Sequence, residues 1–100
     1  MLFSQVPVGD RKVLSELVDK IRHKKENIVA VLIGESETSS KPMIIGVSKN
    51  LKEVHAGNLT KELCSILDGK GGGRPDFSQG SIVNLDRLPE AKEKLSELIQ

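Results

Sequence analysis

Residues 69–81 read GKGGGRPDFSQGS, a run of glycines that ends in an arginine and a proline. A glycine in a folded chain costs about 0.5–1 kcal/mol more than alanine in conformational entropy, so three in series need a physical reason. Without side chains, successive backbone N–H groups can turn toward one point and form a nest for an anion, and Arg74 adds a planar fork of donors that suits a phosphate. The pattern predicts a phosphate-binding loop. A flexible connection with an unrelated arginine is the alternative, since loops concentrate glycine, and spacing alone does not decide between the two.

The residues around the glycines limit what kind of phosphate loop this is. A nucleotide-binding P-loop needs G-x-x-x-x-G-K-[ST], and here Cys64 stands where its first glycine belongs. The dinucleotide motif G-x-G-x-x-G would need a glycine in place of Arg74. Pro75 keeps Arg74 out of the helical region, and we expect Asp76 to cap a turn or to hold Arg74. Both common nucleotide-binding loops are therefore excluded.

Composition and charge describe a small domain without a strong charge bias. The 100 residues suit a single domain over residues 1–100. The 15 basic and 14 acidic side chains nearly cancel, so a basic surface has to come from clustering.

A single cysteine excludes an internal disulfide, and no apolar run reaches the roughly 18 residues of a membrane span. We expect a cytoplasmic protein without membrane contact. Two phenylalanines as the only aromatic residues argue against a reader of single strands, which stacks bases on aromatic rings.

A second group of cations, Arg22, Lys24 and Lys25, ends the first expected helix. Cations at this place complement the helix dipole and usually face water; contact with a phosphate is the other interpretation. His55 and Cys64 lie nine residues apart, and without a CxxC or HxxxH pair they are a weak zinc signal. We expect both to have structural roles, and we expect no metal site.

Apolar periodicity predicts a small α+β domain with helices packed on a mixed sheet. The apolar segments 27–35 and 41–49 are joined by a short polar link, which predicts an antiparallel hairpin. Asp10 and Asn58 are the expected caps of the first two helices, and Gly69 is expected to end the second helix in the left-handed conformation. The expected elements, in the order β-α-β-β-α-β-α, are residues 2–8, 11–25, 27–35, 41–49, 59–68, 81–84 and 87–99.

The glycine-rich stretch resembles the C-terminal signature of alanyl-tRNA synthetases, in their DHH-associated domain. Gly71-Gly72-Gly73-Arg74-Pro75-Asp76, followed by Gln79-Gly80, matches the family pattern G-x-G-G-G-R-P-D-x-A-Q-x-G-G, and the resemblance covers the chain from about residue 5. Ser78 stands where that pattern has alanine, and Ser81 replaces one of its glycines. The related DHH phosphoesterases end the glycine run in histidine. Arginine stays protonated, so it suits holding a phosphate and not general-base chemistry.

The resemblance implies a tRNA-binding module. In those enzymes the domain lies at the C-terminus and binds tRNA around its outer elbow, so that aminoacylation and editing act on the same tRNA(Ala). No catalytic residue and no cofactor are implied for this chain, because ATP and zinc belong to other segments of such a ligase. The implied partners are tRNA and the rest of the synthetase, with a homodimer formed through a helical segment outside this chain. The implied phosphate contacts are Lys70, Gly71, Gly72, Gly73 and Arg74, supported by Gln79, with Arg22, Lys24 and Lys25 as weaker candidates.

Two other functions stay open from the residues themselves. One is an interaction or dimerisation module of the same enzyme, in which the glycine loop only packs and the apolar final helix supplies an interface. The other is the substrate-holding domain of a DHH-type phosphoesterase. Arg74 in place of histidine and the missing Asp-His-His segment weigh against the latter.

Overall fold

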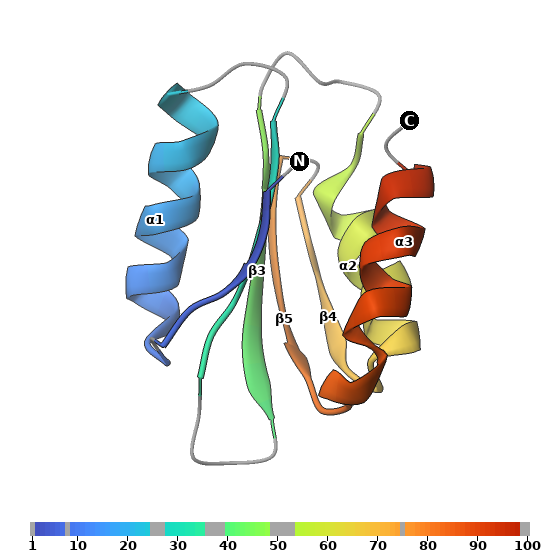
Figure 1. The fold of residues 1–100 in the computed structure, drawn as a ribbon. Coiled ribbons are helices and arrows are strands. Elements are labelled where there is room, and N and C mark those ends of the chain that lie inside the picture. Colours follow the sequence, from blue (N-terminus) through green and yellow to red (C-terminus); the bar gives the residue numbers. More distant parts are fainter. Residues whose placement is uncertain are drawn as a thin grey trace.

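The computed structural model describes residues 2–7, 9–24, 28–35, 40–48, 54–74 and 76–98. Five strands form one sheet in the order β1-β2-β3-β5-β4, in which β1 runs parallel to β2 and the other neighbours are antiparallel. Helix α1 lies on one side of the sheet, and α2 and α3 lie on the other (Figure 1). The elements are β1 (Leu2–Gln5), α1 (Arg11–Lys24), β2 (Val29–Ile33), β3 (Lys41–Val47), α2 (Ala56–Ile66), β4 (Lys70–Gly73), β5 (Phe77–Ile82), a 3₁₀ turn (Leu85–Arg87) and α3 (Leu88–Leu98).

The predicted α+β class and the mixed sheet with packed helices are confirmed. The predicted order of elements lacks one strand, β4, and places the next strand at residues 81–84, where β5 in fact spans Phe77–Ile82. Among the described residues, no helix has the length and apolar character that crossing a bilayer requires.

Strands β2 and β3 are buried on both faces, as their apolar sequences predict. They pair as the expected antiparallel hairpin, with Val31 opposite Ile45. Because successive side chains of a strand point to opposite faces, the sheet supports two cores. The core under α1 contains Leu14, Val18, Ala30, Leu32 and Ile44. The larger core under α2 and α3 includes Ile33, Met43, Ile45, Leu63, Leu67, Ile82 and Leu95.

The helix caps are partly as predicted. The carboxylate of Asp10 accepts a hydrogen bond of 2.9 Å from the backbone N–H of Lys12, so Asp10 caps α1. The prediction that Asn58 caps the second helix is wrong. Helix α2 begins earlier, at Ala56, and its cap is His55, whose Nδ1 accepts a hydrogen bond of 3.2 Å from the Asn58 N–H. The histidine side chain thus has the structural role expected for it.

The end of α2 also differs from the prediction. The left-handed residue is Asp68, with φ of 54°, and Gly69 does not have a positive φ. Glycine is needed at position 69 for another reason: a Cβ there would lie 2.1 Å from the backbone oxygen of Ser81. The close approach of β5, and not a left-handed turn, therefore explains this glycine.

Ser78, which replaces the alanine of the resembled pattern, joins α2 to β5. It is buried, and its Oγ donates a hydrogen bond of 2.9 Å to the backbone oxygen of Ala56. Its Oγ also shares a hydrogen bond with the hydroxyl of Thr60, which is fully buried. Since the single Ser78 hydrogen is used on Ala56, the Thr60 hydroxyl is the donor in the second bond. The substitution is accommodated by hydrogen bonding, as buried hydroxyls require.

Candidate nucleic-acid interface

The expected phosphate-binding residues lie on the β4–β5 hairpin at one edge of the sheet. Lys70 and the three glycines form the edge strand β4, Arg74 lies in the turn, and Gln79 lies on β5. Gly72 is directly opposite Gln79 in the register, and Lys70 is opposite Ser81. The fold therefore brings Lys70, Gly72 and Gln79 together, as the expected site requires. Lys25 lies outside the described residues.

The predicted backbone nest is wrong. A nest needs residues that alternate between right- and left-handed conformations, whereas residues 70–73 form an extended strand and no described glycine has a positive φ. The N–H of Arg74 donates to the oxygen of Phe77 at 3.0 Å, so these two residues form a hydrogen-bonded pair. Because such pairs alternate along an antiparallel ladder, Gly72 bonds to β5 while the backbone groups of Gly71 and Gly73 point away from it. The edge of β4 therefore offers backbone N–H donors at separate positions, and these donors do not converge on one anion.

Packing explains why this strand is rich in glycine. A Cβ at position 71 would lie 2.5 Å from the Cα of Gly80, and a Cβ at position 73 would lie 2.7 Å from the Cα of Ser78. On the same face, Thr60 of α2 comes within 2.9 Å of the position of a Cβ on Gly71. Two of the three glycines in the motif are therefore required by the contact between β4, β5 and α2.

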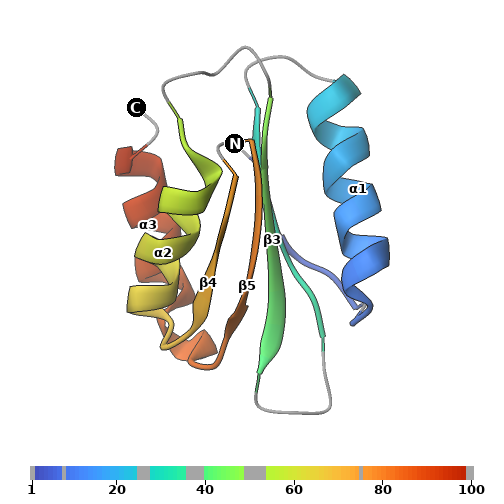
Figure 2. The same ribbon diagram turned by 180° about the vertical axis from the view of Figure 1, so that it is seen from behind.

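The β4–β5 hairpin has one covered face and one open face. Ser78, Gly80 and Ile82 are buried toward α2 and α3, which lie across the sheet from α1 (Figure 2). The alternate residues of β5 point to the α1 side, where Phe77 packs against the core under α1. Helix α1 packs on β2 and β3 and does not cover Gln79 of β5, so the Gln79 side chain is exposed. By register, this open face consists of Lys70, Gly72, Gln79 and Ser81.

Arg11 adds a cation to the open face that sequence reasoning missed. From the first turn of α1, its guanidinium donates to the backbone oxygen of Gly80 at 3.0 Å and to the Ser81 hydroxyl. No sequence signal identified this contact, because its two ends are about 70 residues apart in the chain. Arg11 thus accounts for the serine at position 81, and it brings a positive charge next to Lys70 and Gln79.

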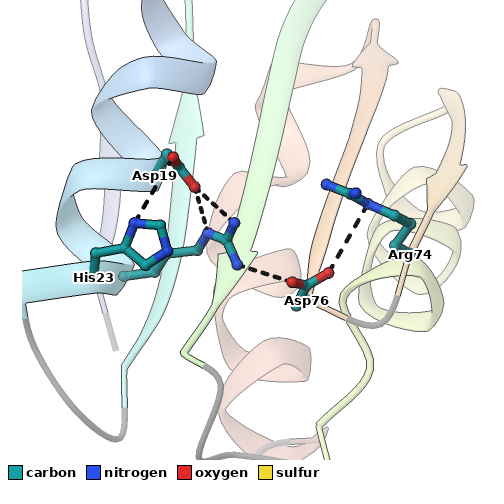
Figure 3. A network of polar contacts seen from close by, with 5 residues as sticks. Asp19, His23, Arg74 and Asp76 are labelled. Atoms are coloured by element: carbon teal, nitrogen blue, oxygen red, sulfur yellow. Dashed lines mark hydrogen bonds and ion pairs between the residues drawn. The ribbon is translucent and has the colours of Figure 1, made fainter.

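Arg22 does not lie at the surface as a phosphate contact requires, so this expectation is corrected. Its side chain is 9% exposed and pairs with Asp19 at 2.6 Å and with Asp76 at 3.0 Å (Figure 3). Its guanidinium carbon also lies 5.5 Å from the centre of the Phe77 ring. Two carboxylates balance its charge. Arg22 therefore ties α1 to the turn of the hairpin, whereas Lys24, the last residue of α1, is exposed.

Asp76 holds both arginines, one more closely than the other. Besides the Arg22 pair, its second oxygen lies 4.0 Å from Nε of Arg74, as the dashed line in Figure 3 shows. The expectation that Asp76 holds Arg74 is thus met at the outer limit of an ion pair. The Arg74 side chain is 72% exposed, so its guanidinium is available to a ligand at the end of the hairpin.

Asp76→Asn is expected to remove part of the acid dependence of folding. Burial by itself raises the pKa of the Asp76 carboxyl, but the hydrogen bond from Arg22 and the charges of Arg22 and Arg74 bring that pKa below its ordinary value. A carboxyl whose pKa is lower in the folded state stabilises the fold above its unfolded pKa of about 3.9. This contribution is lost as the pH falls through the folded pKa.

Urea denaturation of the wild type and Asp76→Asn at pH values of about 7 and about 3 measures this contribution. Because the Asp76 side chain is 39% exposed, we expect a difference below about 1 kcal/mol at neutral pH. The two proteins should converge in acid. A difference that does not change with pH would contradict the assignment, and in an Arg22→Met background the difference should shrink.

Cys64 and His55, the two residues weighed as zinc ligands, have different places in the fold. Cys64 belongs to α2 and its thiol packs against β5, where burial raises the pKa of the thiol. His55 uses its Nδ1 to cap the same helix. In the described ranges, no group of three or more His, Cys, Asp or Glu side chains could hold a metal ion. A buried thiol of this kind behaves as a small apolar side chain.

Fold and site define a small α+β domain that presents cations on an open sheet face. The DHHA1 domain model matches residues 1–100, and the chain belongs to that family. This confirms the resemblance to the DHH-associated domain that the glycine motif indicated.

Relatives and a solved structure agree with this assignment. The chain is 39% identical to the alanine–tRNA ligase of Bdellovibrio bacteriovorus, over 99% of this chain and 11% of that protein. It is 38% identical to the enzyme of Natranaerobius thermophilus, over 100% of this chain and 12% of that protein. The C-Ala domain of Aquifex aeolicus alanyl-tRNA synthetase superposes with a TM-score of 0.89 at 28% identity, over 98% of this chain and 88% of that one. The chain thus spans about a tenth of the length of these ligases.

Proposed function

We propose that this chain is the C-terminal tRNA-binding domain of an alanine–tRNA ligase, a cytoplasmic enzyme. In this role it holds the backbone of tRNA(Ala) near the elbow, so that aminoacylation and editing act on the same molecule. The observation that carries the proposal is the similarity of nearly the whole chain to alanine–tRNA ligases and to the solved C-Ala domain. The partners are then tRNA and the rest of the synthetase, with a homodimer formed through a helical segment outside this chain. ATP and zinc serve other segments of the ligase.

The open face and the hairpin turn supply the phosphate contacts in this proposal. Lys70 and Arg74 are exposed cations on either side of the glycines, and Gln79 offers an amide between them. Side chains thus replace the backbone nest as the binding groups, while Gly71, Gly72 and Gly73 allow the RNA to come close. Lys24 at the end of α1 is a secondary contact in this proposal, and Lys25, the next residue in the sequence, stays a candidate beside it. Contacts of this type position a nucleic acid without reading its sequence, and their affinity falls steeply with salt.

Arg74→Ala is expected to weaken tRNA binding about tenfold, because a hydrogen bond to a charged group contributes about 1.5–3 kcal/mol. The measurement is fluorescence anisotropy of a labelled tRNA(Ala) transcript with the whole chain at two salt concentrations. Loss of one phosphate contact should also reduce the slope of log affinity against log salt by about one.

Arg87→Ala is the matched control for this experiment. It removes the same charge, but Arg87 lies in the 3₁₀ turn before α3, where it pairs with Glu90 at 2.8 Å. We expect wild-type affinity for this variant. Equal losses of tRNA affinity in both variants would show that Arg74 acts only through the net charge of the domain. Absence of tRNA binding by the wild type would refute the proposed function.

One observation favours the alternative of an interaction module. Leu98 at the end of α3 is 40% exposed. It lines a pocket with the apolar Val54 and Leu59 and with four polar or charged residues, His55, Asn58, Lys61 and Glu62. If no protein in the experiment binds tRNA, sedimentation velocity over a range of concentrations decides whether the surface around Leu98 supports self-association. A monomer throughout that range would count against it.

A further inference from the structure

Gly72 differs from the other glycines whose surroundings the structure describes. At each of the others, a Cβ would come within 3.0 Å of another atom, as at Gly71 with 2.5 Å and Gly46 with 2.3 Å. At Gly72 the nearest atom to a Cβ would be Cε of Lys61, 3.9 Å away. The φ of Gly72 is not positive either, so any L-residue can adopt its backbone conformation. The fold therefore has room for a side chain at position 72.

Glycine in a strand without a packing reason calls for another explanation. Glycine costs conformational entropy in a strand and contributes no side-chain contacts, so a residue with a side chain would stabilise β4 better. A glycine within a strand often marks the place where a ligand or another backbone approaches closely. Gly72 lies at the centre of the open face, opposite the exposed Gln79.

The side chains around Gly72 are cationic. Lys70 lies two residues away on the same face, and Arg11 reaches the adjoining pair of residues on β5. Lys61 extends from α2 to the outer edge of β4, where its Cε lies close to Gly72. In the part of the chain that the structure describes, no carboxylate is within ion-pair distance of these three cations. This arrangement is complementary to a polyanion that lies flat on the strand.

We infer that a ribose–phosphate segment of the RNA lies directly against β4 at Gly72, between Lys61 and Lys70. Gly72 is a binding residue because it has no side chain, and Lys61 is a further phosphate contact from α2. The inference rests on the proposed function and deepens it, since it identifies which face of the hairpin meets the RNA. Gln79 is placed to hydrogen-bond to a ribose hydroxyl or a phosphate oxygen across from Gly72.

Gly72→Val tests this inference, because valine favours strands and places a branched side chain on the open face. We expect a melting temperature equal to or above that of the wild type, together with tRNA(Ala) binding at least tenfold weaker. Lys61→Ala should weaken binding by several-fold and reduce the salt slope by about one. Lys92→Ala, which removes an exposed lysine from α3 on the opposite side of the sheet, should bind like the wild type.

The outcomes separate the inference from the function on which it rests. If Gly72→Val is folded and binds like the wild type, the inference is overturned while the proposed function stands. If Gly72→Val melts at a lower temperature, Gly72→Ala replaces it; a lower melting temperature for alanine as well would assign the glycine to packing and overturn the inference. Absence of tRNA binding by the wild type refutes the proposed function, and the inference fails with it.

Discussion

Leu63→Ala is expected to lower the free energy of unfolding by about 2–5 kcal/mol. Leu63 lies at the middle of α2, is fully buried, and belongs to the core under α2 and α3. Truncation to alanine removes apolar contacts and leaves a cavity that the close-packed surroundings fill only in part. The effect matters for the site, because α2 carries Lys61 and packs against both strands of the hairpin.

Urea denaturation measures this effect, with Leu98→Ala as the matched control. Leu98 belongs to α3 and is 40% exposed, so the same change should cost less than about 0.5 kcal/mol. Losses of similar size at the two positions would contradict the packing of α2 and α3 on the sheet. A change in the denaturant slope would indicate an altered unfolded or native state in place of a simple loss of stability.

The fold was predictable from the sequence wherever apolar periodicity is regular. Helix α1, the β2–β3 hairpin and α3 lie close to their predicted ranges, because each has one or two clearly apolar faces. Strand β4 was not predictable in this way. Glycine is depleted in strands, and KGGG forms a strand through its pairing with β5, at a place where a Cβ on residue 71 or 73 would have no room. That reason lies in tertiary packing and not in local propensity.

The candidate site was predictable only as far as the motif extends along the chain. Lys70, Gly72 and Gln79 are near one another in sequence, and the hairpin register brings them together. The residues supplied by other elements could not be foreseen: Arg11 and Lys61 reach the open face from α1 and α2. Arg22 was misjudged for the same reason, since its partner Asp76 is 54 residues away and only the fold shows that its charge is balanced.

Gly46 is a second glycine whose role only the fold reveals. It lies within the apolar strand β3, where α1 crosses the sheet. A Cβ at this position would lie 2.3 Å from Cγ1 of Val18 and 3.3 Å from Cδ of Arg22. Val18 is fully buried and cannot turn away. Gly46→Ala therefore forces α1 away from the sheet, and overpacking of this kind costs about 1–3 kcal/mol.

A double-mutant cycle distinguishes this steric contact from a general intolerance of β3 to substitution. Val18→Ala alone removes two buried methyl groups and should also destabilise the protein, by about 1–3 kcal/mol. In Gly46→Ala/Val18→Ala, the new methyl group occupies space that Val18 has vacated. The double variant should therefore lose less stability than the sum of the single variants, by about 0.5–3 kcal/mol.

Urea denaturation of the four proteins gives this coupling energy. Losses that add within about 0.3–0.5 kcal/mol would show that the two residues do not compete for the same space. The glycine at position 46 would then need an explanation other than its contact with Val18.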